Sequence, residues 1–296
     1  MSAAQTQAPA GSEDEQQGHG FRIFTPLTAL VVALLIVCFW SYLKWMWHVW
    51  MQSDYYGHGP LVPLISAYLI YSRRKQFVEA EATHNWWGLP LLLAGIVIFL
   101  AAVYLDVNFI QGFAMVMVIG GLVILLWGWG RSKVILFPVT FLVFMVPTGR
   151  LLVTQFSGPL QTYGAAVAAK AVSLVGMPVE LKGTTIDIPD YTFEVAQACS
   201  GLKSTIAMSA LAALFAYLVD GPMWKRVVLF IAGAPVALAA NATRITFTLI
   251  LGRAFGPEAA EGFFHTLSGL MVFVVGLIGL FLVAKLLKCD KMRPNI

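Results

Sequence analysis

Charged residues are scarce in this chain of 296 residues: 11% are Asp, Glu, Lys or Arg, whereas 59% are hydrophobic. Soluble domains carry about 25% charged residues, so this composition excludes an ordinary soluble fold. The apolar runs are separated by short polar breaks, which leave no room for a large soluble domain. The sequence therefore predicts a single polytopic membrane bundle.

Cysteine is equally sparse, with Cys38, Cys199 and Cys289 far apart in the sequence. An odd number of distant cysteines does not indicate a disulfide framework. No two of them have metal-ligand spacing, and we expect neither a metal nor a cofactor. Cys38 lies in an apolar run and Cys289 near the basic C-terminal end, so both are interpreted as small apolar residues.

The net charge of +4 carries information mainly through its placement. No basic stripe with interleaved aromatic residues is present, so the chain does not resemble a nucleic-acid-binding protein. Basic residues cluster instead in the breaks at 73–75, 131–133, 225–226 and 285–293. Positive residues near membrane helices concentrate on the cytoplasmic side, so these breaks indicate topology.

The expected fold is an all-α polytopic bundle with about eight transmembrane helices. Residues 1–20 are predicted to be a disordered cytoplasmic tail, 21–290 a single transmembrane domain, and 291–296 a cytoplasmic tail. The predicted helices cover approximately residues 27–50, 61–71, 87–105, 111–129, 134–146, 199–220, 227–251 and 263–284.

Two segments between these helices are predicted not to span. Residues 151–177 are less apolar and are expected to form an amphipathic helix at the membrane interface. Residues 184–188 and 191–195 alternate around a Pro189-Asp190 turn, which predicts an extracytoplasmic β-hairpin. With eight spans, every basic break faces the cytoplasm, and so do both termini. If 151–177 spanned as well, the last two basic breaks would face outward.

Three polar residues in the last three helices converge in depth. Counted from the cytoplasmic ends of their helices, Cys199, Arg244 and His265 lie roughly 31, 27 and 30 Å away. The hydrocarbon core is about 30 Å thick, so all three reach the outer boundary. Each also has a simpler interpretation: a buried thiol, a snorkelling arginine and a capping histidine. Their convergence at one depth favours a shared functional site over these three separate interpretations.

The residue types suit thiol chemistry. A thiolate is the reactive form of cysteine, and a helix N-terminus and a nearby cation such as Lys203, expected one turn on and on the same face, lower its pKa. His265 is a candidate acid and base, and Arg244 a candidate stabiliser of an oxyanion. Asn241 is placed to orient Arg244, and Ser200 is a further supporting candidate.

The order and spacing of these motifs resemble a known family. Ala198-Cys199-Ser200-Gly201-Leu202-Lys203-Ser204, Asn241-Ala242-Thr243-Arg244 and Phe264-His265 resemble the signature of the exosortase/archaeosortase family. The block His58-Gly59-Pro60-Leu61-Val62-Pro63-Leu64 with Arg73-Arg74 also resembles it. Histidine at the third signature position is similar to the bacterial, EpsH-like branch.

This resemblance implies a membrane-embedded cysteine transpeptidase of the bacterial inner membrane, with its site on the extracytoplasmic side. Cys199 would form an acyl-thioester, supported by Arg244 and His265. The implied partners are the bilayer and secreted proteins with a C-terminal sorting signal of the PEP-CTERM type, in the context of exopolysaccharide and biofilm production. His58 and Glu194 are candidate substrate-binding residues.

Two other classes stay open at this point. Polar residues within a membrane also mark transport pathways, although transporters usually place them near the midplane and show internal repeats. A scaffold in an exopolysaccharide assembly complex would leave Cys199 incidental.

Overall fold

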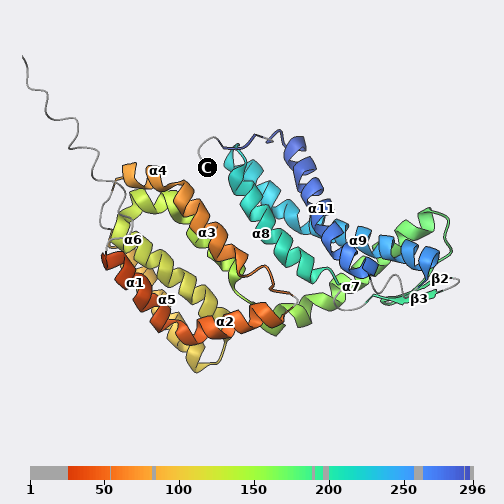
Figure 1. The fold of residues 1–296 in the computed structure, drawn as a ribbon, viewed down its shortest axis with the longest axis horizontal. Helices are drawn as coiled ribbons and strands as arrows, with labels where there is room; N and C mark the ends of the chain where they lie inside the picture. Colours follow the sequence, from red (N-terminus) through yellow and green to blue (C-terminus); the bar gives the residue numbers. More distant parts are fainter. Residues whose placement is uncertain are drawn as a thin grey trace, which may run out of the picture. The chain divides into compact units, whose positions relative to one another are not determined.

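The structure is a computed structural model that describes residues 26–53, 55–81, 85–188, 191–195, 200–256, 263–289 and 291–293. The chain divides into two units, residues 1–43 and 44–296. The described part is mostly helical and contains one small sheet (Figure 1). Its elements are α1 Pro26–Cys38, α2 Trp40–Gln52, α3 Leu61–Ser72, α4 Arg74–Glu79, α5 Gly88–Tyr104, α6 Asn108–Phe141, the 3-10 turn η1 Leu142–Met145, α7 Gly149–Leu174, β1 Glu180–Lys182, β2 Thr185–Ile188, β3 Tyr191–Glu194, α8 Leu202–Leu218, α9 Met223–Phe255 and α11 Phe263–Leu286.

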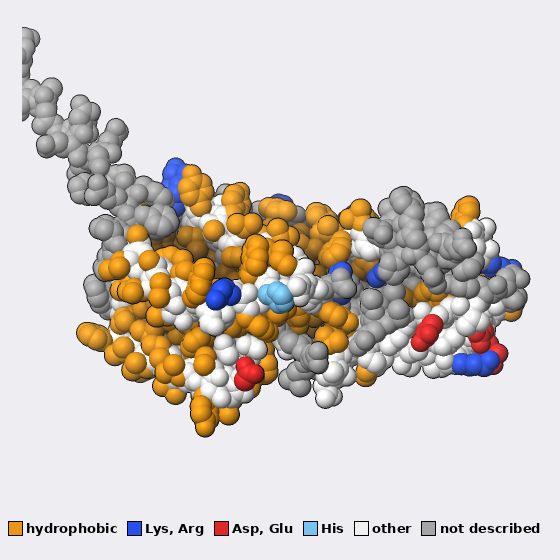
Figure 2. Space-filling model, turned by 60° about the horizontal axis from the view of Figure 1, so that its bottom comes forward, with side chains coloured by type: hydrophobic (Ala, Val, Ile, Leu, Met, Phe, Trp, Pro, Cys, Tyr) orange, Lys and Arg blue, Asp and Glu red, His pale blue; other side chains and the backbone are white. Residues whose placement is uncertain are grey.

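Apolar side chains on the helix surfaces fit a membrane protein. Along α11, for example, Leu270, Val274 and Ile278 are exposed. Figure 2 shows hydrophobic side chains over most of the visible described helix surface. Among the described residues three helices are long and apolar enough to cross a bilayer, or four if α1 and α2 form one broken span. The predicted first helix is thus interrupted at Phe39, and the count of eight spans stays a prediction.

Helix α6 folds back on itself at Gly128, whose φ of 70° and ψ of 179° are not helical. A Cβ built on Gly120 would lie 4.0 Å from Val139, although these positions are 19 residues apart. In a continuous helix they would be separated by roughly 28 Å. The two arms, 108–127 and 129–141, therefore correspond to the predicted helices 111–129 and 134–146. The Ser132 hydroxyl closes the bend by donating to the Gly128 carbonyl (2.6 Å).

The predicted hairpin is present and belongs to a larger sheet. Strands β2 and β3 pair antiparallel with Thr185 opposite Glu194, and β1, which the pattern missed, pairs with the other edge of β2. The predicted turn at 189–190 lies outside the described residues. All three residues of β1 are exposed, so they show no alternation of buried and exposed side chains from which a strand could be predicted.

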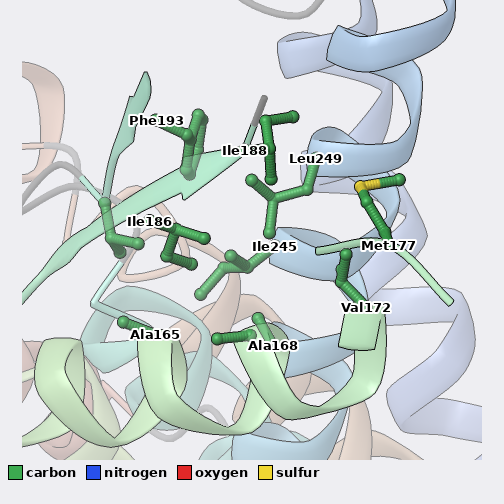
Figure 3. Packing of buried hydrophobic residues seen from close by; sticks show 11 residues of the cluster. Ala165, Ala168, Val172, Met177, Ile186, Ile188, Phe193, Ile245 and Leu249 are labelled. Carbon is green, nitrogen blue, oxygen red and sulfur yellow. The ribbon is translucent and has the colours of Figure 1, made fainter. Parts of the chain in front are cut away.

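A hydrophobic core joins the sheet to α7 and α9. Side chains of β2 and β3 face those of α7 and the C-terminal part of α9 (Figure 3). This core explains why the predicted segment 151–177 is helical but less apolar: small residues on one face of α7 lie under the sheet. The buried members are Ala165, Ala168, Ala169, Val172, Met177, Ile186, Ile188, Phe193, Val195, Ile245 and Leu249.

Helices α8, α9 and α11 form one antiparallel bundle (Figure 1). They approach closely at small residues: a Cβ on Gly233 would lie 2.5 Å from the Ala212 Cβ, and one on Gly276 2.5 Å from the Met208 Cε. Membrane helices depend on such close approach because lipid gives no hydrophobic drive for their association. The contacts fix which faces of the three helices meet.

The Gly233→Ala variant should destabilise the protein, because its new methyl group would overlap Ala212. Overpacking of this kind costs about 1–3 kcal/mol, which should appear as a lower melting temperature in detergent. Gly269→Ala on α11 is the control, since no atom lies within 4 Å of its Cβ position. Equal melting temperatures for the two variants would contradict the close crossing.

Candidate functional site

The segment that contains Cys199 is held at both ends. Residues 196–199 lie outside the described part, so the thiol itself is not placed. Before it, Val195 is fully buried, and the Gln161 side chain of α7 donates to its carbonyl. After it, Ser200 is 1% exposed. The candidate nucleophile therefore belongs to a short connection between two fixed points.

Helix α8 begins later than the sequence indicated, at Leu202 instead of near Cys199. The N-cap is Gly201, whose φ of 82° is left-handed and suits glycine. The Ser200 hydroxyl accepts from the Leu202 N–H (3.4 Å), a local support for the helix start. Gly201 is not helical, and Cys199 lies outside the described residues, so the expected shared face of Lys203 and Cys199 stays a prediction.

The Asn241 side chain of α9 lies against Gly201. A Cβ on Gly201 would be 2.8 Å from Asn241 Nδ2, and Asn241 is 2% exposed. A Cβ on Gly164 of α7 would lie 3.7 Å from the same atom. The position two residues after Cys199 is thus in direct contact with the Asn-x-x-Arg motif. The sequence predicted that Asn241 orients Arg244; the contact of Asn241 with Gly201 was not predicted.

The helix registers place Arg244 on the α8 side of α9. Arg244 follows Gly233 by eleven residues, and Gly201 precedes Ala212 by eleven residues. Eleven residues make about three turns, so each pair shares one helix face. Gly233 and Ala212 touch, and the two helices run antiparallel. Gly201 on α8 and Arg244 on α9 therefore lie roughly 16 Å from this contact, toward the same end of the bundle and on the helix faces that meet. Arg244 is half-buried there.

Position 265 is related to α8 in the same way. It precedes Gly276 by eleven residues within α11 and therefore shares its face, which contacts Met208. Gly201 lies seven residues, or two turns, before Met208. Position 265 is thus about one turn, roughly 5 Å, farther along the bundle than Gly201. The side chain of His265 is outside the described part.

A cavity of about 360 Å³ adjoins the start of α8 and brings in the N-terminal motif. His58, Lys203 and Phe273 all line it, from the α2–α3 loop, α8 and α11 respectively. Residues more than 140 positions apart in the sequence meet here. Nothing in the sequence pairs His58 with Lys203, because neither has a neighbour that marks the contact.

The loop that carries His58 is fixed by buried hydrogen bonds. Trp50 Nε1 donates to the Met145 carbonyl (2.9 Å), and the hydroxyls of Tyr56 and Thr148 are 2.6 Å apart. The His58 ring forms a hydrogen bond with the backbone of Phe144. Burial nevertheless lowers the pKa of His58, so the neutral ring is favoured.

The remaining candidate, Glu194, is not brought to this cavity. It is exposed on β3 opposite Thr185. In the same sheet, hydrogen bonds from Thr192 and Lys182 lower the pKa of Asp187. Figure 2 shows acidic and basic side chains gathered at the end that carries the sheet. Glu194 belongs to that polar surface.

The fold and the site define a membrane protein in which Gly201, at the start of α8 and two residues after Cys199, contacts the Asn-x-x-Arg motif of α9. A transmembrane exosortase family model, Exosortase_EpsH, matches residues 50–282, and the chain belongs to this family. The family is generally one of cysteine transpeptidases. Comparison with curated proteins and with solved structures gave no match.

An Arg244→Cys variant should form a disulfide with Cys199 on mild oxidation, because the registers place Arg244 beside Gly201, two residues after Cys199 in the sequence. Disulfides need Cα atoms about 4.4–6.8 Å apart, so the reaction reports lateral proximity. The link would be identified by peptide mass spectrometry in a background without Cys38 and Cys289. Arg253→Cys, nine residues farther along α9, is the control. Equal cross-linking of both variants, or of neither, would contradict the arrangement.

The pKa of His58 predicts a pH-dependent stability. Its folded pKa is below the usual value of about 6.5, so the unfolded chain takes up this proton first as the pH falls. Melting temperature should therefore decrease below about pH 6.5. His58→Gln, which retains a donor for the Phe144 backbone, should show a smaller decrease between pH 7.5 and 5.5. An unchanged pH profile would exclude His58 as the cause.

Proposed function

We propose that the protein is a membrane-embedded cysteine peptidase or transpeptidase in which Cys199 is the nucleophile. One observation carries this proposal: Asn241 of the Asn-x-x-Arg motif lies against Gly201, two residues after Cys199. This contact supports lateral proximity between the motif on α9 and the start of α8, about which equal depth says nothing. A transporter or a scaffold gives no reason for this contact.

The reaction has two steps. His265 takes the proton of the Cys199 thiol, and the thiolate attacks the carbonyl carbon of the scissile peptide bond, forming an oxyanion that Arg244 stabilises. The tetrahedral intermediate collapses to a thioester as the C–N bond breaks, and the leaving amine takes the proton from His265. Water or an acceptor amine then attacks the thioester, gives its proton to His265 and releases the thiolate. Lys203 and the start of α8 favour the thiolate electrostatically.

The proposed topology has eight spans, with both termini in the cytoplasm of a bacterium and the protein in its inner membrane. Basic residues from three of the breaks, Arg73, Arg226 and Arg293, surround Tyr217 at one end of the bundle. This convergence supports a common, cytoplasmic side for them. The two arms of α6 support separate fourth and fifth spans, and α7, bound to the sheet, supports a non-spanning segment 151–177.

The proposed substrates are secreted proteins with a C-terminal signal of the PEP-CTERM type: a short motif, one membrane helix and a basic tail. The tail would hold the helix in place, so that the motif emerges at the height of Gly201 and Arg244. His58 lines a cavity beside this level and is proposed to position the substrate. Glu194 is a proposed contact on the outer surface. Exopolysaccharide production is the proposed cellular context.

Substitutions at the three candidate residues test the reaction. Processing of a C-terminally tagged substrate should be abolished by Cys199→Ala. It should decrease roughly 100- to 1,000-fold for Arg244→Gln, which removes the charge that stabilises the oxyanion, and His265→Ala should also lose it. Membrane levels of each variant would be compared by immunoblot, and an acyl-enzyme on Cys199 sought by mass spectrometry.

Cys38→Ala is the matched control, because Cys38 is an exposed thiol on α1. It should retain full processing and the acyl-enzyme. A membrane-impermeant thiol reagent should modify Cys199 from outside the cell and inhibit processing. Normal processing by Cys199→Ala would exclude the peptidase and favour a scaffold or a transporter.

A further inference from the structure

A buried tyrosine at the opposite end of the bundle is surrounded by arginines. Tyr217, near the end of α8, is 5% exposed, and Phe137 stacks on its ring at 3.8 Å. The guanidinium carbon of Arg73 lies over this ring, 4.8 Å from its centre. That of Arg293 lies 5.7 Å from the centre. Two cations from distant parts of the chain therefore share one aromatic ring.

A third arginine completes the cluster. Arg226 interacts electrostatically with Tyr217, Arg73 and Arg293. It is half-buried, and its Nε donates to the Ala216 carbonyl (2.8 Å). Like charges held together repel each other, and partial burial reduces the screening by water. The cluster needs negative charge to be stable.

That charge does not come from the described residues. Within this part of the chain the salt bridges are those of Lys182 with Glu180 and Asp187, in the sheet. Arg73, Arg226 and Arg293 take part in none of them. An anion from outside the described chain would neutralise them.

The cluster also has hydrogen-bond donors without acceptors. The Tyr217 hydroxyl oxygen and Arg73 Nε are buried and have no partner among the described residues. Guanidinium groups carry only donors, and burying a donor unpaired is costly. Several donors converging with positive charge match the oxygens of a phosphate group.

An apolar cavity of about 230 Å³ adjoins two members of the cluster. Tyr217 and Arg226 line it together with Phe137, Phe144 and Phe230. A small inorganic anion would not occupy a cavity lined by phenylalanine side chains. A molecule with a phosphate at one end and a hydrocarbon chain at the other fits both features.

Nearby side chains place the cluster at the level of lipid headgroups. Trp224 is exposed at the start of α9, and the Lys225 ammonium lies 5.6 Å from its ring centre. Exposed tryptophan and lysine of this kind are typical of the membrane–water interface. Basic pockets between helices at the cytoplasmic interface bind anionic lipid headgroups.

We propose that Arg73, Arg226, Arg293 and the Tyr217 hydroxyl bind the phosphate of an anionic phospholipid, with one acyl chain in the cavity lined by Phe137, Phe144 and Phe230. The site is at the opposite end of α8 from the cysteine segment. It does not depend on the proposed peptidase activity. The lipid would join α3, α8, α9 and the C-terminal segment by supplying their common counter-ion.

The full-length protein, purified in a neutral detergent and delipidated, would be titrated with phosphatidylglycerol, phosphatidylcholine or inorganic phosphate. Phosphatidylglycerol should raise the melting temperature by several degrees, and the other two should have little effect. Arg73→Gln should weaken the phosphatidylglycerol response about tenfold in concentration, as expected for a lost charged hydrogen bond. Arg74→Gln, which changes the neighbouring residue stacked on Tyr71, is the matched control and should respond normally.

Tyr217→Phe keeps the ring and removes only the hydroxyl, so it tests the site even if Arg73→Gln does not fold. It should retain less phosphatidylglycerol in native mass spectrometry. An equal response to phosphatidylcholine would overturn the anionic site, and an equal response to inorganic phosphate would overturn the lipid. Asp290→Asn tests whether the counter-ion comes from the chain itself. A large loss of stability of this variant in lipid-free detergent, together with no response of the wild type to phosphatidylglycerol, would also overturn the lipid site.

Discussion

The close crossing of α8 and α9 is the constraint on which the candidate site depends. Gly233 and Ala212 admit no larger side chain between the helices, so the two faces that meet there are fixed. Three turns along each helix, the same faces carry Gly201 and Arg244. Gly276 on α11 and its contact with Met208 repeat this relation for position 265. Small residues in the middle of the bundle thus determine which polar residues meet at its end.

Much of this arrangement could be predicted from sequence. The hydropathy pattern located the helices, alternation found the hairpin, and counting along helices gave Arg244 and Cys199 a common level. Lateral contact could not be predicted, because depth can be counted along a single helix, whereas proximity depends on how two helices pack against each other. The left-handed conformation of Gly201 was also missed: a glycine before an apolar run is compatible with helix or cap. The start of α8 at Leu202 instead of near Cys199 follows from this conformation.

The two ends of the bundle differ in how polar groups are satisfied. At the cysteine end, hydrogen bonds from Trp50 and Gln161 to backbone carbonyls fix the loops. At the other end, cations gather around an aromatic ring, and acceptors are lacking among the described residues. If the proposed lipid site exists, stability in detergent is expected to vary with the lipid retained.

Helix α9 continues for eleven residues past Arg244, to Phe255, and its Ile245 and Leu249 anchor the sheet and α7. This covering layer is about 16 Å deep. If the proposed peptidase activity holds, a substrate protein that is already folded outside the cell would have to reach the site past this layer. An extended chain covers about 3.3 Å per residue, so roughly five unstructured residues would have to separate the folded part of the proposed substrate from the bond to be cut. The length of that spacer would then select among substrates independently of their sorting motif.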